Sequence, residues 1–365
     1  MTEMKIGGET FNVEVEGPES APVLMISNSL GSNLHMWDDQ MPALSKHFRI
    51  VRYDSRGHGQ SAAPSGPYSL EQLGKDALAI LDALGVKKAH WMGLSKGGAV
   101  GQWLLLHAPD RIERAVLANT AAQFGGADAW NERLRIVREQ GMGGLVQAVI
   151  DRWFTKDFQA RAPEAIARIR AAFEKTPAEG YAACMAALRD LDLRDAIRNI
   201  RNQVLIIIGK HDPATPPEAG KAIASAIPGA RLVELDAAHL SNIEAADAFN
   251  KAVIDFLTAP AKPARPKSFP SRKQAAKKAA KKAAKARPSA RAAKKAAKKS
   301  VKKAAKKATK PVKKAAKKVA RRPAVKAARK AGKAVKKAAR KPVGKAAKKP
   351  ARKGVKKTAG KRSKK

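Results

Sequence analysis

Ser95 lies in the sequence GLSKGG, residues 93–98, with one glycine two positions before it and another two positions after it. The apolar run 89–93 predicts a strand before this turn, and the pattern of residues 97–107 predicts a helix after it. A sharp strand-to-helix turn exposes a serine hydroxyl for nucleophilic attack, and the first amides of the helix point at an oxyanion formed by that attack. We therefore expect Ser95 to be a nucleophile and the Lys96 amide to bind the oxyanion.

A serine nucleophile needs a base and an acid that orients the base. After a nucleophile turn of this type the acid and then the histidine follow in chain order, each just beyond a strand. Asp212 follows the apolar run 204–209, and His239 follows the run 231–235. We expect Asp212 to hold one ring nitrogen of His239, so that the other nitrogen can take the proton of Ser95.

Other histidines and acids compete for these two roles. His211 adjoins Asp212 and points elsewhere if that acid faces the site. Asp236 and Glu244 flank His239 too closely to be positioned independently, and we expect both to be solvated surface charges. The remaining histidines all precede the acid and are less favoured as the base: His35, His47, His58, His90 and His107.

Two glycine-containing loops follow early strands and border the expected site. In the loop 26–31, the amide of Leu30 is the candidate for a second oxyanion donor. The segment DSRGHGQS, residues 54–61, follows the next strand. Its Arg56 and His58 are expected to hydrogen-bond the loops beside the pocket rather than to act in catalysis.

Near-continuous apolar runs of strand length alternate with helical patterns along the first 260 residues. Runs that are apolar on both faces are typical of parallel strands covered by helices. The expected strands are 23–27, 48–53, 89–93, 114–119, 204–209 and 231–235, and the expected helices are 70–84, 97–107, 218–227 and 242–257. This alternation predicts a doubly wound, mostly parallel α/β sheet.

Two segments stand outside the alternation. Residues 11–16 alternate apolar and polar side chains, which predicts an edge or hairpin strand. From residue 127 to about residue 200 there is no strand pattern, but a helical periodicity broken at glycines and prolines. This stretch is too long for a plain connection, so we expect a helical lid that walls a pocket at one edge of the sheet.

The charge of the chain is divided unevenly between its two parts. The 365 residues carry 74 Lys and Arg against 31 Asp and Glu, a net charge of +43, but 46 of the basic residues and none of the acidic ones lie in 261–365. We therefore expect a near-neutral globular domain over residues 1–258. Residues 259–365 are expected to be a disordered polycationic tail, because they offer too few bulky apolar side chains to pack.

The cysteine content and the N-terminal residues indicate where in the cell the protein is located. Cys184 is the only cysteine, which excludes an intramolecular disulfide and a metal site of several cysteines. The first residues do not combine a basic start with an apolar stretch, and the longest apolar run, 204–208, is far shorter than the roughly 20 residues that cross a membrane. These features predict a cytoplasmic protein with no membrane span.

Five segments together resemble the 3-oxoadipate enol-lactonase family of α/β-hydrolases. They are NSLGSNLHMW (28–37), DSRGHGQS (54–61), GLSKGG (93–98), DPATPP (212–217) and AHLSNIE (238–244). The resemblance spans residues 1–258 and implies hydrolysis of the 3-oxoadipate enol-lactone to 3-oxoadipate, in the β-ketoadipate route of aromatic degradation, with no cofactor and no metal. Asn28-Ser29 replaces the His-Gly pair usual in this loop of α/β-hydrolases, and this departure narrows the resemblance to the enol-lactonases.

The implied substrate carries a carboxylate, so its pocket should offer a cation or several amides. Trp130 and Arg133 lie three residues apart in the predicted lid, and therefore on one face of a helix. In one interpretation Arg133 binds the substrate carboxylate beside Trp130. In the other, Trp130 packs within the lid and Arg133 is solvated.

Other hydrolases of the same fold stay open as alternatives. A haloalkane dehalogenase or an epoxide hydrolase would carry Asp in place of Ser95, so both are disfavoured. A broad carboxylesterase, a carbon–carbon bond hydrolase or a cofactor-free perhydrolase would keep the same three residues.

The tail repeats Lys-Lys-Ala-Ala from residue 273 onward and resembles the lysine-rich arm of linker histones. Such a segment is expected to bind the phosphates of DNA, RNA or polyphosphate non-specifically by releasing counterions. Phe269 is its only aromatic residue, so base stacking is not expected. This leaves a second hypothesis, a nucleic-acid-associated protein located at the nucleoid, whose tail carries the main function.

Overall fold

The computed structural model describes residues 2–260, which contain one mixed sheet of eight strands. The strands lie in the order β1-β2-β4-β3-β5-β6-β7-β8. β1 and β2 form a hairpin that joins β4 antiparallel, and every other neighbouring pair is parallel. The strands are β1 Thr2–Ile6, β2 Glu9–Glu16, β3 Val23–Ser27, β4 Arg49–Tyr53, β5 Ala89–Leu94, β6 Ile112–Ala118, β7 Gln203–Gly209 and β8 Arg231–Leu235.

Helices connect the strands and fill the long insertion after β6. The α-helices are α1 Met41–Leu44, α2 Leu70–Ala83, α3 Lys96–His107, α4 Ala127–Gln140, α5 Val146–Trp153, α6 Lys156–Arg161, α7 Pro163–Glu174, α8 Ala178–Arg189, α9 Pro217–Ala226, α10 Ser241–Glu244 and α11 Ala246–Leu257. Short 3-10 helices are η1 Leu34–Gln40, η2 Pro109–Arg111, η3 Met142–Leu145 and η4 Ala196–Asn199.

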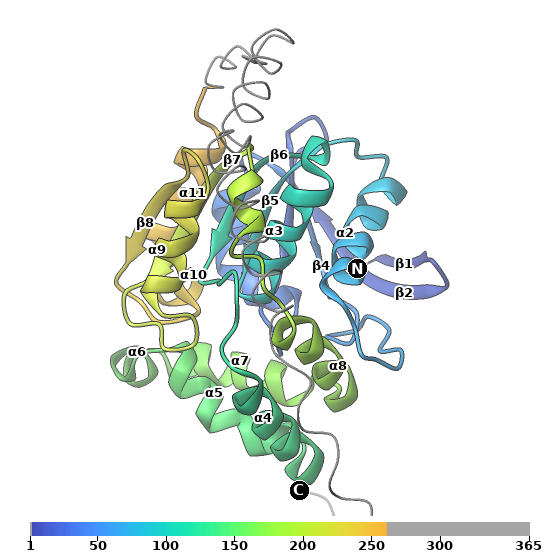
Figure 1. Ribbon diagram of the computed structural model, residues 1–365. Helices are drawn as coiled ribbons and strands as arrows, with labels where there is room; N and C mark the ends of the chain where they lie inside the picture. The colour runs from blue at the N-terminus through green and yellow to red at the C-terminus, as the bar shows by residue number, and fades with distance from the viewer. Residues whose placement is uncertain (1, 261–365) are drawn as a thin grey trace, which may run out of the picture. The chain divides into compact units, whose positions relative to one another are not determined.

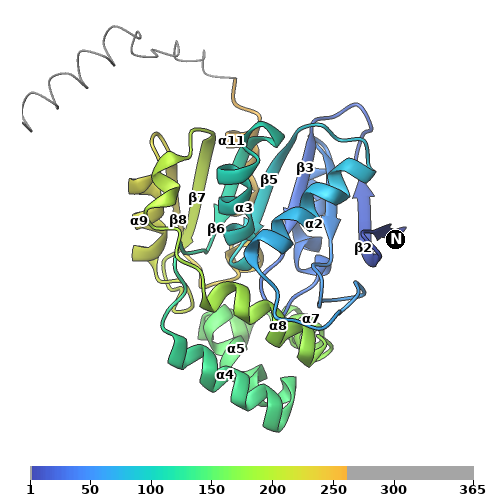
Figure 2. The same ribbon diagram turned by 45° about the vertical axis from the view of Figure 1, so that its right-hand side comes forward.

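The sheet is covered on both faces, as the apolar runs predict. α2 and α3 lie in front of the sheet and α11 lies behind it (Figure 2). Every residue of β5 is buried, and β7 is buried except at its first position. A strand buried on both faces gains from apolar side chains at successive positions, which is why these strands read as continuous runs rather than as alternations. The predicted doubly wound α/β fold is confirmed.

The predicted helical lid is also present. Helices α4 to α8 gather at one end of the sheet (Figure 1). Aromatic contacts tie them together: the rings of Trp153 and Phe173 meet edge to face at 5.8 Å, and those of Phe173 and Tyr181 at 5.6 Å. Backbone hydrogen bonds join the lid to the body: Leu240 N donates to the carbonyl of Trp153, Leu193 N to that of Ala122, and Tyr68 N to that of Ala183.

The helix predicted over 242–257 is in fact two helices. α10 ends at Glu244, and Ala245 adopts φ −126° and ψ 48° before α11 begins. The side chain of Asn242 donates to the carbonyl of Met36, which anchors α10 against the loop after β3. The break lets α10 close over the site while α11 packs on β7 and β8.

The described residues, 2–260, belong to one compact unit. Within the described residues, no helix combines the length and the apolar character needed to cross a bilayer. The predicted tail, residues 259–365, lies outside the described residues except for positions 259 and 260.

Candidate active site

Ser95 lies in the sharp turn between β5 and α3. Its backbone has φ 58° and ψ −112°, a left-handed conformation that costs a non-glycine residue of the order of 1–3 kcal/mol. The flanking glycines are required because the backbone packs so closely here. A Cβ on Gly97 would lie 2.2 Å from the carbonyl oxygen of Ser27, and one on Gly93 would lie 2.1 Å from the carbonyl oxygen of Gly97.

Asp212 and His239 are brought together from two loops at the same edge of the sheet. His239 Nδ1 lies 2.8 Å from Asp212 Oδ2, and both side chains are almost fully buried. The other carboxylate oxygen accepts from the amides of Ala214 and Thr215, and Oδ2 also accepts from the Thr215 hydroxyl and from Asn119 Nδ2.

These contacts decide the ionisation of the acid. Burial alone would raise the pKa of Asp212. The charge of protonated His239 and the hydrogen bonds from His239, Thr215 and Asn119 outweigh burial and hold the pKa of Asp212 below its ordinary value. Asp212 is therefore ionised at neutral pH and fixes His239 with Nδ1–H toward it, which leaves the other ring nitrogen free to act as a base.

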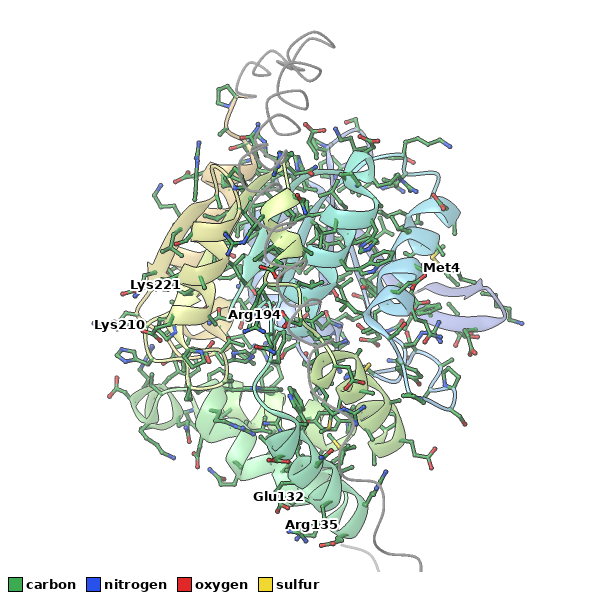
Figure 3. The ribbon with its side chains drawn as sticks, viewed as in Figure 1. Met4, Glu132, Arg135, Arg194, Lys210 and Lys221 are labelled. Atoms are coloured by element: carbon green, nitrogen blue, oxygen red, sulfur yellow. The ribbon has the colours of Figure 1, made fainter. Side chains whose placement is uncertain are left out.

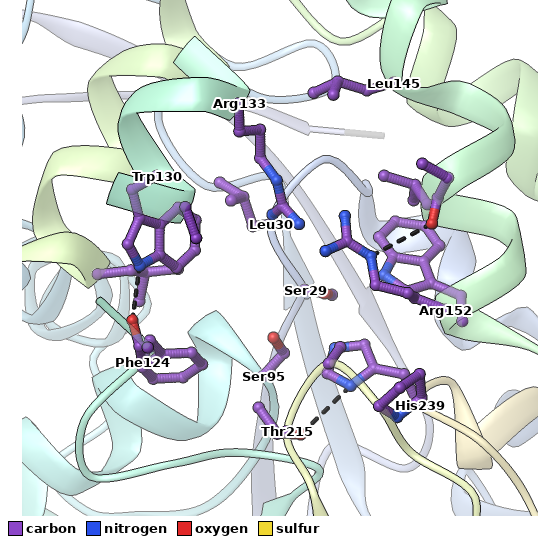
Figure 4. A pocket seen from close by; sticks show the side chains of 18 of the residues that line it. Ser29, Leu30, Ser95, Phe124, Trp130, Arg133, Leu145, Arg152, Thr215 and His239 are labelled. Atoms are coloured by element: carbon purple, nitrogen blue, oxygen red, sulfur yellow. Dashed lines mark hydrogen bonds between the residues drawn. The ribbon is translucent and has the colours of Figure 1, made fainter. Parts of the chain in front are cut away.

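Ser95 and His239 line the same cavity, which has a volume of about 570 Å³. Ser95 is only 6% exposed, but its hydroxyl is on the wall of this cavity and is thus within reach of a small substrate. Figure 4 shows Ser95 and His239 at one side and the lid helices at the other. The cavity is the right size for a small organic acid or ester.

The predicted oxyanion donors come from the residue after Ser95 and from the loop after β3. Lys96 is the first residue of α3, and amides in that position have no partner within the helix. Leu30 lies in the loop after β3 and lines the cavity next to Ser29. The carbonyl of Asn28 accepts from the amide of Gly97, which ties this loop to the first turn of α3.

His58 is hydrogen-bonded to the loop after β3 that contains Leu30. Its Nε2 accepts from the amide of Gly31 at 2.9 Å, and its Nδ1 lies 3.2 Å from the carbonyl of Arg56. Burial and the nearby Lys96 charge hold the pKa of His58 well below its ordinary value, so the ring is neutral. Arg56 pairs with Asp76 through two hydrogen bonds of 2.6 Å. His58 therefore bonds a loop beside the pocket, as the sequence predicts, whereas the Arg56 side chain bonds to helix α2 and not to a loop.

Two arginines of the lid face the cavity. Arg133 and Arg152 line it, and Figure 4 shows their guanidinium groups turned toward each other on the side opposite Ser95. Arg133 lies 5.2 Å from the ring centre of Trp130, whose indole N–H donates to the carbonyl of Phe124. Within residues 2–260, neither arginine forms a salt bridge with an acidic side chain.

Comparison with known proteins identifies the family. The family model described as "alpha/beta hydrolase fold" matches residues 22–246, well over half of the chain. The chain belongs to the α/β-hydrolases. It is therefore a hydrolytic enzyme.

Individual relatives of this α/β-hydrolase include enol-lactonases. The 3-oxoadipate enol-lactonase 2 of Acinetobacter baylyi is 41% identical over 243 residues, which cover 67% of this chain and 91% of the relative. A crystal structure of the enol-lactonase from Burkholderia xenovorans LB400 matches with a TM-score of 0.70 and 47% identity, over 70% of this chain and 100% of that one. A malate-bound thermophilic esterase from Thermogutta terrifontis matches at 27% identity with a TM-score of 0.67, over 70% of this chain and 98% of that one.

One prediction about this α/β-hydrolase is wrong. Glu244 is not a solvated surface charge: it is buried and accepts hydrogen bonds from the amide of Ala238 at 3.0 Å and from Thr155 of the lid. It is buried because α10 folds back over the histidine loop. The sequence pattern predicts one long helix here and gives no sign of this fold-back. Asp236 is exposed as expected, and it takes the ring of His211 away from the site.

Arg152 and Asn119 also belong to the site, although neither was predicted from the sequence. Arg152 is one of many arginines in the lid sequence, and nothing local marks the one that faces the cavity. Asn119 follows β6 directly, and the same strand-end rule that indicates Asp212 and His239 would have indicated it too. No group of three or more His, Cys, Asp or Glu side chains among the described residues could hold a metal ion.

Proposed function

We propose that this α/β-hydrolase opens an enol-lactone that carries a carboxylate, specifically that it converts the 3-oxoadipate enol-lactone to 3-oxoadipate in the β-ketoadipate route of aromatic degradation. The observation that carries the proposal is the pair Arg133 and Arg152, two lid cations with no acidic partner among the described residues, facing a cavity with Ser95 on its opposite side. The similarity to two enol-lactonases and to a malate-bound esterase supports it.

The geometry allows an acyl-enzyme mechanism. His239 takes the proton of Ser95 as Oγ attacks the lactone carbonyl, and the amides of Leu30 and Lys96 bind the oxyanion. Collapse of the tetrahedral intermediate breaks the ring C–O bond. The departing enolate takes the proton from His239 and then ketonises. A water molecule deprotonated by His239 attacks the acyl-enzyme, and a second collapse frees the product and returns the proton to Ser95.

In this proposal the two arginines select an acidic substrate. Burial and the neighbouring charge of Arg133 both lower the pKa of Arg152, because two cations share a partly desolvated site. A bound carboxylate relieves this repulsion and accepts hydrogen bonds from either guanidinium group. Binding the substrate by its carboxylate end places the lactone ring between the lid and Ser95.

The test compares an acidic lactone with a neutral ester. For Arg152→Met we expect KM for the 3-oxoadipate enol-lactone to rise about tenfold or more, because a charge-assisted contact is lost, while turnover of 4-nitrophenyl acetate stays unchanged. Arg138→Met is the matched control, because Arg138 is exposed on α4, the same lid helix as Arg133, and does not line the cavity. Arg135 is unsuitable as a control: it pairs with Glu132 and Glu139 (Figure 3), and Glu132 also lines the cavity. Ser95→Ala should abolish both activities.

Three outcomes separate the alternatives. Full activity in Ser95→Ala removes the nucleophile assignment. Equal losses on both substrates in Arg152→Met contradict the role of the lid cations. High turnover of neutral esters by the unaltered enzyme, with little on the acidic lactone, identifies a broad carboxylesterase instead.

A second function is proposed for the basic tail. Residues 261–365 carry 46 Lys and Arg and no acidic residue, a composition that binds phosphate backbones with an affinity that falls steeply as salt rises. We propose non-specific contact with DNA, RNA or polyphosphate, which would hold the enzyme at the nucleoid. The support is compositional, and removal of the tail tests it.

A further inference from the structure

Asn119 bonds to two loops that come from different parts of the chain. Its side-chain nitrogen lies 3.0 Å from Asp212 Oδ2 and 3.2 Å from the carbonyl oxygen of Ala238, the residue before His239. The acid loop follows β7 and the histidine loop follows β8. Asn119 itself follows β6, so three neighbouring strand ends meet at this one amide.

The orientation of the amide is fixed by a further partner. Ser241 Oγ lies 2.6 Å from Asn119 Oδ1, and the hydroxyl donates to this oxygen. With the oxygen engaged by Ser241, both protons of the nitrogen are available to Asp212 and to the carbonyl of Ala238. Asn119 is 1% exposed, so no water competes for these bonds.

The backbone of Asn119 is held in an unusual conformation. Its φ is +42°, one of only two positive values for a residue other than glycine within residues 2–260, and the other is that of the nucleophile Ser95. Its amide donates to the carbonyl of Ile207 in β7 at 2.8 Å. Asparagine tolerates this left-handed region better than most residues, but the strain is accepted only where surrounding contacts impose it.

We propose that Asn119 is a positioning residue for catalysis: it joins the acid loop to the histidine loop and thereby sets the separation and angle of Asp212 and His239. This inference rests on the proposed roles of Ser95, Asp212 and His239. It assigns to Asn119 a contact that none of the three makes, because its amide bonds at once to the Asp212 carboxylate and to the main chain beside His239.

Thr215 is another side chain that contacts both members of the pair, and it has a different effect. Its hydroxyl lies 2.7 Å from Asp212 Oδ2 and 3.3 Å from His239 Nδ1. The Thr215 hydroxyl thus reaches the two side chains but not the backbone of the histidine loop. The acid loop also meets that backbone through the amide of His211, which donates to the carbonyl of Ala237, but this bond does not touch the Asp212 carboxylate. The amide of Asn119, in contrast, bonds both to the carboxylate and to a main-chain atom next to the base.

Other charged groups around the pair do not replace this contact. On the side of α10, Glu244 bonds to the amide of Ala238 and to Thr155, and these bonds reach neither Asp212 nor the ring of His239. On the side of the lid, Glu132, Arg133 and Arg152 line the cavity, and none has a hydrogen bond to Asp212 or His239. Hydrogen bonds to the Asp212 carboxylate come from Ala214, Thr215, Asn119 and His239.

The test replaces Asn119 by residues that its backbone accepts. Asn119→Gly keeps the left-handed conformation and removes both donors. Asn119→Asp keeps the size and turns the donor into an oxygen that faces the Asp212 carboxylate. For both variants we expect kcat on 4-nitrophenyl acetate to fall about tenfold to a hundredfold with little change in KM, because the base is misplaced while the cavity is intact.

A shift in the pH profile separates positioning from general destabilisation. In Asn119→Gly the Asp212 carboxylate loses one hydrogen-bond donor and therefore attracts protonated His239 more strongly. The fall of kcat/KM at low pH, its acid limb, should then move to higher pH. The control is Gln102→Leu, which removes another buried amide that bonds a backbone carbonyl just after β6, that of Ala121. The control should lower the melting temperature and leave both kcat and the acid limb in place.

The outcomes are distinct from those of the proposed function. A folded Asn119→Gly or Asn119→Asp enzyme with unchanged kcat and an unmoved acid limb overturns the inference, and so does an equal shift in Gln102→Leu. If Ser95→Ala keeps its activity, the proposed site itself fails. Labelling of Ser95 by a fluorophosphonate probe, slowed in both Asn119 variants and unaffected in Gln102→Leu, supports the inference without depending on the substrate.

Discussion

The ammonium group of Lys96 is buried, and within residues 2–260 it has no hydrogen-bond partner. Burial lowers its pKa, and the attraction of Cys184, Asp54 and Asp76 recovers only part of that loss. The side chain is therefore a cost to the folded state, although the backbone amide of the same residue is a proposed oxyanion donor. The two roles of Lys96 can be separated by changing the side chain alone.

Lys96→Met should stabilise the protein, because an unpaired buried ammonium is replaced by an apolar side chain of similar length. The expected gain in free energy of unfolding is of the order of 1–3 kcal/mol at neutral pH, measured by urea denaturation. Lys75→Met, on the exposed face of α2, should change stability by less than about 0.5 kcal/mol.

The gain from Lys96→Met should depend on pH in a defined direction. The pKa of Lys96 is lower in the folded state, so the unfolded chain binds the proton more tightly. The stability of the unaltered enzyme therefore rises between that lowered pKa and the ordinary value of 10.5, and the advantage of the variant shrinks over the same range. The buried charge of Lys96 is not the cause if the difference in free energy of unfolding between Lys96→Met and the unaltered enzyme stays constant over this range. A variant less stable than the unaltered enzyme has the same meaning.

At the scale of elements, the lid and the histidine loop are fastened together. The carbonyl of Trp153, at the end of α5, accepts from the amide of Leu240. The carboxylate of Glu244 accepts from Thr155, at the start of α6, and from the amide of Ala238. The junction between α5 and α6 is thus linked to Leu240 directly and to Ala238 through Glu244, the two residues that flank His239. A displacement of the lid would therefore also move His239.

Glu244→Gln should weaken this junction. A glutamine presents an N–H donor group in place of one of the two oxygens with which the carboxylate accepts these bonds, so at least one buried donor loses its partner. We expect a loss of about 1–3 kcal/mol in the free energy of unfolding and a lower kcat on the acidic lactone. Glu164→Gln, on the exposed first turn of α7, is the matched control and should change neither. If a folded Glu244→Gln enzyme keeps its kcat, the contact of Glu244 with the lid does not position His239.

At the scale of the whole molecule, the charge and the catalytic groups belong to different parts of the chain. The described residues contain every group proposed for catalysis, whereas most of the positive charge lies in residues 261–365. The solved enol-lactonase structure from Burkholderia is covered completely by 70% of this chain.

A chain that ends at residue 260 should keep the kcat and the melting temperature of the full chain. It should lose binding to duplex DNA, which in the full chain weakens by orders of magnitude as salt rises from about 50 to 200 mM. Activity assays, thermal unfolding and fluorescence anisotropy with labelled DNA measure the three quantities. Loss of kcat in the shortened chain would favour a catalytic role for the tail, and unaltered DNA binding would remove the proposed polyanion contact.

The chain order of the site residues and the class of the fold follow from local patterns. Apolar runs and glycine spacing are local properties, and they indicate the strand before Ser95, the helix after it and the positions of Asp212 and His239 at strand ends. Helix boundaries depend on more than local patterns. The 242–257 pattern is continuous, yet Ala245 breaks it, because contacts of α10 with the loop after β3 override local propensity.

The sequence by itself determined the fold class and the identity of the three residues proposed for catalysis, because both follow from short-range patterns along a parallel α/β sheet. Only the tertiary structure decided which lid arginines face the nucleophile, that Glu244 is buried, and that Asn119 bonds to both the acid and the histidine loop. Those facts depend on side-chain directions and on packing between segments far apart in the chain. No local pattern encodes which of several similar residues will meet across such distances.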